Sequence, residues 1–193
     1  MRKTLYLKFI LAYFIFGFFG FVVVASFVNS MTMEHLKREK ADALYREATL
    51  IANTYASDLY NNETSLDTVK KQLDALDTYL SANLWIINPS GRMVLDSQAP
   101  VDLENEIVIS DFNHTITGNS YYTVGNFFGS FSEEQLSVFA PITSDYKVRG
   151  YVVINFPLSI LVASCNSLLN ISYLMLIILF LLSMIILIFF TIS

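Results

Sequence analysis

Two long runs of apolar residues lie near the ends of this chain. The first extends from Phe9 to Val28 and the second from Ile171 to Ile192, which are 20 and 22 residues without a charge. At about 1.5 Å of rise per residue, a helix of this length crosses the roughly 30 Å of hydrocarbon in a bilayer. We therefore predict a short N-terminal tail, a first membrane helix, a folded outer domain and a second membrane helix, at residues 1–8, 9–28, 29–167 and 168–192.

The segment after the first run has the pattern of a long helix. Apolar residues recur at spacings of three and four, and neither Pro nor Gly occurs from Asn29 to Asn62. We expect this helix to end at Asn61 and Asn62. A second helix is predicted to start at Thr64, with Asp67 three residues later in the position that caps free backbone N–H groups. One face of this second helix carries Leu66, Val69, Leu73, Leu76 and Leu80.

The remaining outer segment has the pattern of short strands. Residues 84–97 read as a hairpin in which aromatic and β-branched residues flank a Pro-Ser-Gly turn. Residues 98–120 read as a loop-rich segment with room for one short helix. Further strands are predicted at 121–125, 136–142 and 150–155, and Pro157 suits the first turn of a helix that continues into the second apolar run. The short links favour an α+β domain with about five antiparallel strands.

The distribution of charge predicts the orientation in the membrane. All 17 acidic residues lie between Glu34 and Asp145, whereas Arg2, Lys3 and Lys8 precede the first apolar run. The positive-inside rule then places both termini in the cytoplasm and the central domain outside the plasma membrane of a bacterial cell. A cleaved signal peptide is the alternative for the first run, but that run is longer than such a peptide needs. Cys165 is the only cysteine, so no intramolecular disulfide can form.

Three stretches of the outer segment together resemble a Cache domain, the PAS-like extracytoplasmic sensor of histidine kinases and chemoreceptors. These are the hairpin at residues 85–97, Val138-Phe139-Ala140-Pro141-Ile142, and Gly150-Tyr151-Val152-Val153-Ile154. The resemblance covers residues 29–165 and implies a long N-terminal helix and a second helix packed on a central five-stranded sheet. An unrelated antiparallel α+β domain is the alternative. The motifs of amino-acid-binding and dicarboxylate-binding members are not recognisable, so the resemblance does not imply a ligand class.

Within the chain we find no motif for catalysis. The sequence has no Gly-rich phosphate loop, no Cys pair, no His-Glu-x-x-His and no Gly-x-Ser-x-Gly. We predict no catalytic residue, no cofactor, no metal site and no nucleic-acid partner. The resemblance implies the sensing and transmembrane region of a two-component histidine kinase, with kinase residues expected beyond Ser193. The alternatives are a chemoreceptor, a cyclic-dinucleotide enzyme, or a two-span protein whose outer domain binds a protein partner.

Candidate ligand-binding residues combine aromatic walls with a few polar groups, as small-molecule sites do. An acidic cluster at Asp102, Glu104, Glu106 and Asp111 could bind cations, although such a run is more often a solvated face. The apolar stripe of the long helix suggests a homodimer. A small molecule and the membrane are the other predicted partners. The predicted ligand-binding residues are Asp96, Ser97, His114, Tyr121, Tyr122 and Tyr151.

Overall fold

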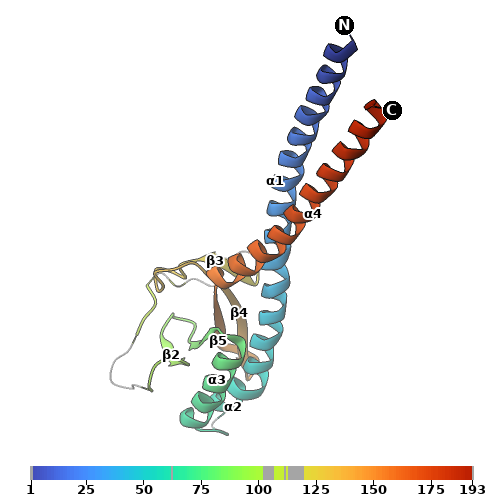
Figure 1. Ribbon diagram of the computed structural model, residues 1–193. Coiled ribbons are helices and arrows are strands. Elements are labelled where there is room, and N and C mark those ends of the chain that lie inside the picture. The colour runs from blue at the N-terminus through green and yellow to red at the C-terminus, as the bar shows by residue number, and fades with distance from the viewer. Residues whose placement is uncertain (1, 62, 102–106, 111, 113–119, 193) are drawn as a thin grey trace. The chain divides into compact units, whose positions relative to one another are not determined.

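A computed structural model describes residues 2–61, 63–101, 107–110, 112 and 120–192. The chain divides into two compact units, residues 1–36 with 161–193 and residues 37–160. Figure 1 labels the helices and strands. In chain order they are α1 (Arg2–Ile51), the π-helix η1 (Ala52–Ala56), α2 (Ser57–Tyr60), α3 (Leu66–Leu80), β1 (Asn83–Ile87), β2 (Met93–Asp96), β3 (Tyr122–Gly125), β4 (Gln135–Ser144), β5 (Lys147–Pro157) and α4 (Leu158–Ile192).

The first unit consists of the start of α1 and most of α4. Both helices are long and apolar enough to cross a membrane, with mean hydropathies of 2.4 and 3.0. Between them, the Tyr13 and Ser183 hydroxyls form a hydrogen bond, and the ring of Phe180 packs directly on Gly17. Gly17 therefore has no room for a side chain, and its identity allows the two helices to pack closely.

The second unit contains one five-stranded sheet with the order β2-β1-β5-β4-β3, and every neighbouring pair is antiparallel. This confirms the predicted α+β class and the predicted number of strands. Strands β4 and β5 form the longest pairing, from Gln135 opposite Pro157 to Ser144 opposite Lys147. Their turn places Asp145 and Tyr146 at φ values of 52° and 60°.

Alternate residues of the strands form the core against the helices. Leu84 and Ile86 of β1 lie opposite Ile154 and Val152 of β5, and all four are fully buried. Helix α3 contacts β1, and η1 contacts β4 and β5, so this face of the sheet is the helix face. Buried residues recur every second position along each strand and every third or fourth position along α1, where Leu44 and Ile51 are buried, so each element turns one apolar side to the core.

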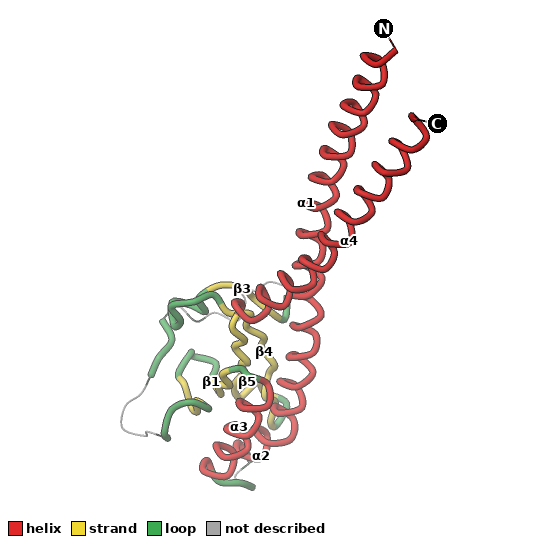
Figure 2. Tube along the Cα trace, viewed as in Figure 1, coloured by secondary structure: helices red, strands yellow, loops and turns green. Residues whose placement is uncertain are grey.

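The other face of the sheet is covered by loops, and we call it the loop face. Figure 2 shows the loop segments that follow β2 and β3 on the side of the strands away from α1. The packed residues on this side come from β1, β4, β5 and the loops. They are Trp85, Ile87, Ile109, Phe127, Phe139 and Val153.

Three local predictions were wrong in detail. The second helix is capped by Ser65, whose hydroxyl accepts a hydrogen bond from the backbone N–H of Thr68, rather than by Thr64. The long helix is not regular to its end, since the wide turn η1 interrupts it. Pro157 is the last residue of β5, opposite Gln135, rather than a residue of the first turn of a helix. A proline is tolerated at the end of a strand, where its missing N–H does not interrupt the pairing.

Candidate functional site

A cavity of about 370 Å³ opens on the loop face, between β1, β2 and two loops. The lining is mostly apolar and includes a single charged side chain among the described residues. This composition, together with the volume, is typical of sites for small molecules. The lining residues are Trp85, Met93, Asp96, Ile107, Val108, Ile109, Ser110, Phe128, Gly129 and Ser130.

Trp85 forms the wall of the cavity that is contributed by β1. Its side chain is buried, with 4% of the residue exposed, and its Nε1–H has no hydrogen-bond partner among the described residues. A buried donor left in this state is unfavourable by about 1–3 kcal/mol.

The loop between β3 and β4 forms the opposite wall. Phe127, Phe128 and Gly129 have φ values of 45°, 52° and 76°, so three consecutive residues adopt a left-handed conformation. Each of the two phenylalanines carries a conformational cost of about 1–2 kcal/mol there. Aromatic packing offsets this cost, because the ring of Phe131 stacks on Trp85 at 5.0 Å and Phe127 meets the same indole edge-on at 5.5 Å.

Asp96 brings the charge to the site. It lies directly opposite Trp85 in the pairing of β1 with β2, which places the two side chains on the same face of the sheet. One carboxylate oxygen accepts a hydrogen bond of 2.9 Å from the backbone N–H of Gln98. A carboxylate can accept about four hydrogen bonds, so Asp96 retains capacity to bind a ligand.

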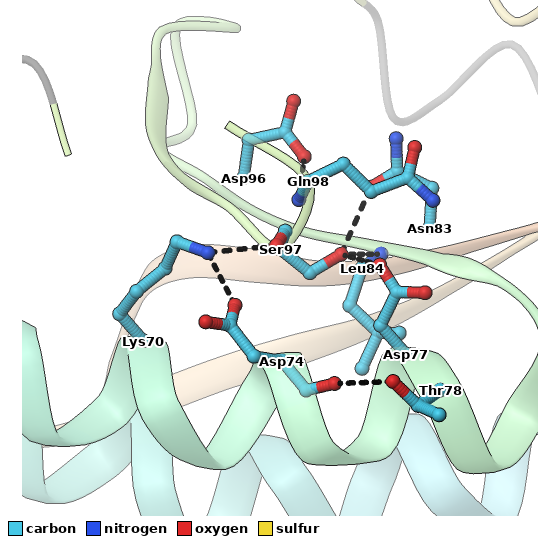
Figure 3. Close-up of polar contacts among 9 residues, drawn as sticks. All are labelled: Lys70, Asp74, Asp77, Thr78, Asn83, Leu84, Asp96, Ser97 and Gln98. Atoms are coloured by element: carbon cyan, nitrogen blue, oxygen red, sulfur yellow. Dashed lines mark hydrogen bonds and ion pairs between the residues drawn. The ribbon is translucent and has the colours of Figure 1, made fainter. Parts of the chain in front are cut away.

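Ser97 follows Asp96 but serves the junction between the sheet and α3 (Figure 3). Its hydroxyl donates to Asp77 at 2.7 Å and accepts from the backbone N–H of Leu84 at 2.9 Å. Lys70 donates to the Ser97 carbonyl at 2.7 Å and also forms an ion pair with Asp74. The structure thus gives Ser97 a set of internal partners and places it outside the residues that line the cavity.

The predicted tyrosines lie at two different places. The Tyr121 hydroxyl donates to Asp42 of α1, and its ring contacts Tyr45 and Tyr122. This hydrogen bond to a carboxylate, together with the nearby charge, raises the pKa of Tyr121 above 10.0. Tyr121 and Tyr122 therefore connect the start of β3 to α1.

Tyr151 packs against the loop-face cluster, which includes Trp85 and Ile109 of the cavity lining. Its ring meets that of Phe112 edge-on at 6.0 Å. Burial raises its pKa, because the charged phenolate is poorly solvated there. His114 and the acidic cluster at Asp102, Glu104, Glu106 and Asp111 lie outside the described residues.

Sequence reasoning grouped two residues of this region, Asp96 and Tyr151, and did not select the residues that build most of the cavity. The sequence placed Trp85 in the predicted hairpin, but the alternation of apolar and polar residues along a strand does not reveal that its Nε1–H lacks a hydrogen-bond partner. Phe128, Gly129 and Ser130 were missed because Asn126-Phe127-Phe128-Gly129 reads as an ordinary turn. A run of aromatic residues beside a glycine was the only signal that this loop packs inward.

No protein-family model matches this sequence, and no curated protein matches it. Among solved structures, the extracellular domain of vpHK1S-Z8, described as a histidine kinase, aligns with a TM-score of 0.52 at 13% identity, over 74% of this chain and 61% of that one. The sensor domain of the histidine kinase DctB from V. cholerae aligns with a TM-score of 0.47 at 16% identity, over 70% and 58%. The Campylobacter jejuni chemoreceptor Tlp3, in complex with L-norvaline, gives 0.48 at 15% identity, over 82% and 62%.

The alignment with the extracellular domain of vpHK1S-Z8 confirms the predicted fold. The second unit has the architecture of a PAS-like domain, with helices on one face of a five-stranded antiparallel sheet. This chain spans about three fifths of the length of the solved chains that it matches. The chain also has two helices that are long and apolar enough to span a bilayer.

Proposed function

We propose that this chain is the sensing region of a membrane receptor, and that its signal is a small molecule bound in the loop-face cavity. The observation that carries this proposal is a cavity of about 370 Å³ whose lining combines the aromatic side chains of Trp85 and Phe128 with one carboxylate, that of Asp96. The fold of the outer unit supports the same reading.

The proposal also covers the site residues and their roles. Asp96 would contact the ligand directly, and Tyr151 would support the cavity by packing against the cluster that includes Trp85 and Ile109. Ser97, Tyr121 and Tyr122 would instead hold the neighbouring elements in place, since their described contacts are with Asp77, Leu84, Asp42 and Tyr45. His114 remains a candidate from the sequence alone.

A screen of ligands against the intact protein tests this function. Trp85 is the only tryptophan in the chain, so indole fluorescence reports on the cavity without ambiguity. A compound that binds only the folded state at a hundredfold excess over its Kd stabilises it by about 2.7 kcal/mol. We expect one chemical class to raise the unfolding midpoint of the protein in nanodiscs and to change the fluorescence together.

A pair of substitutions makes this screen specific. Ser130→Phe fills the cavity, whereas Ser132→Phe adds the same ring at an exposed residue that does not line it. Binding should be lost in the first variant and retained in the second. Equal binding by both variants, or no response to anions, cations and neutral metabolites alike, would contradict small-molecule sensing in this cavity.

We further propose that residues 9–28 and 168–192 span a bacterial plasma membrane, with residues 1–8 in the cytoplasm and residues 29–167 outside. The test uses Lys3→Cys and Tyr79→Cys in a Cys165→Ala background, since Tyr79 is 80% exposed. A reagent that cannot cross membranes should label the cysteine at position 79 in intact cells and leave the one at position 3 unlabelled. Labelling of both, or of position 3 alone, would refute this topology.

For the output we propose a histidine kinase that acts as a homodimer. The resemblance of the outer domain and its likeness to the extracellular domain of vpHK1S-Z8 support this choice. Membranes that contain the full-length receptor should incorporate phosphate from ATP in an acid-labile form, as phosphohistidine is, and cross-linking should trap pairs. A receptor that transfers no phosphate to itself would favour a chemoreceptor or a cyclic-dinucleotide enzyme.

A further inference from the structure

We infer that the cavity takes a small organic cation, rather than an amino acid or another carboxylate. This inference rests on the proposed function and adds the ligand class to it. The chemistry is that of an amine whose carboxyl group is absent or blocked, such as an amino amide or an amino alcohol.

The first argument is the charge of the chain segment that builds the site. Between Arg92 and Lys147 the sequence contains no Lys or Arg at all. The same segment supplies β2, both loops of the cavity and strand β3. Among the described residues of this segment, the acidic ones are Asp96, Glu133, Glu134 and Asp145. A ligand entering here meets a negative potential that attracts cations and repels carboxylates.

The second argument is the set of groups that line the cavity. Among the described residues, Asp96 is the only charged group of the lining, and the aromatic rings come from Trp85 and Phe128. An ammonium group is favoured by both, since it pairs with a carboxylate and binds the face of an aromatic ring. A carboxylate placed at the same position would lose its water without gaining a basic partner.

The third argument concerns the basic side chains near this hairpin. Arg92 pairs with Val108 through the backbone, but it is exposed and does not line the cavity. Lys70 is held by the carbonyl of Ser97 and by Asp74, and its side chain is only 15% exposed. Its charge is therefore already paired at the junction with α3 (Figure 3). Recruiting it for a ligand carboxylate would break both of these interactions.

The positions of Trp85 and Asp96 allow one ligand to use both groups. The two residues are directly opposite one another across β1 and β2 and both line the cavity, so one small molecule can lie against the ring and the carboxylate together.

The experiment compares three probes that share one side chain. Leucinamide has an ammonium group and a carbonyl, leucine adds the carboxylate, and N-acetylleucinamide removes the positive charge. Each is titrated into the intact protein in nanodiscs while Trp85 fluorescence is recorded. We expect leucinamide to bind about tenfold more tightly than leucine or the neutral amide, as one charge interaction of about 1 kcal/mol or somewhat more implies.

Two variants locate the selectivity. Asp96→Asn should bring leucinamide and the neutral amide to within about twofold of one another, because the charge pair is removed while the cavity is kept. Glu133→Gln makes the same change of charge at an exposed residue that does not line the cavity, and should keep the preference.

The outcomes separate this inference from the proposed function. Tighter binding of leucine than of leucinamide, with a response that Ser130→Phe abolishes, would overturn the cationic class and leave sensing in the cavity intact. No response to leucinamide would also overturn it, as would a response to Mg²⁺ or Ca²⁺ alone. A cationic preference that survives in Asp96→Asn would remove Asp96 from the site.

Discussion

The hydroxyl of Ser97 gives the sharpest test of how the hairpin is attached to the helices. Ser97→Ala removes one oxygen that both donates to Asp77 and accepts from the backbone N–H of Leu84. Leu84 is fully buried and Ser97 is 6% exposed, so water cannot easily replace the lost acceptor. Leaving one buried N–H unsatisfied costs about 1–3 kcal/mol, and we expect a loss of about 2 kcal/mol in the free energy of unfolding.

The measurement is thermal unfolding of the intact protein in nanodiscs, followed by Trp85 fluorescence. For a folded unit of residues 37–160, a loss of this size lowers the midpoint by roughly 6–10 °C. Ser90→Ala is the matched control, because the Ser90 hydroxyl also makes one side-chain hydrogen bond, to Asn88, but is exposed. A Ser97→Ala midpoint within about 1 °C of that control would refute the reasoning, since the buried N–H would then have found another acceptor.

Two further predictions concern the connection of β3 to α1 and the hairpin turn. Tyr121→Phe removes the hydrogen bond to Asp42, so the unfolding midpoint of this variant should lie below that of the wild type at neutral pH. The difference should vanish as the pH rises through the raised pKa of Tyr121, because the bond needs the protonated hydroxyl. A difference that stays constant with pH, or an equal effect of Tyr79→Phe, would contradict this prediction. Gly91→Ala combines a φ of 83° with a new Cβ only 2.7 Å from the Cβ of Phe112, so it should destabilise the protein by about 2–4 kcal/mol. Gly129→Ala, at a φ of 76° in open space, should cost about 1 kcal/mol, and equal midpoints of the two variants would refute the clash.

The sequence predicted the elements whose pattern is set by local periodicity. Both apolar runs, the long helix and the hairpin around Gly91 could be placed because burial repeats every two residues in strands and every three to four in helices. The antiparallel orientation of the strands followed from the short links between them, because a short link cannot make a parallel crossover. These features need no knowledge of distant contacts.

The features that were missed depend on such contacts. Ser65 and Thr64 are both residues that cap helices, and composition alone does not fix which of the two starts α3; in the structure it is Ser65. The left-handed pair Phe127 and Phe128 is unfavourable locally and forms because their rings pack in the loop-face cluster. The partner-free state of the Trp85 Nε1–H is likewise a property of the assembled site, and no pattern along the chain encodes it.

The wide turn η1 has a consequence for the phase of α1. Buried positions follow the spacing of an α-helix through Ala41, Leu44, Ala48 and Ile51, and then shift by one residue to Ala52 and Ala56. The extra residue is absorbed without moving the buried stripe off the sheet. Removing one residue from η1 would restore a regular helix, and residues 37–51 would then turn about the helix axis by about 100° relative to the sheet. The π-helix thus decides which side of this stretch of helix packs on the domain and which side is left to solvent or to a partner.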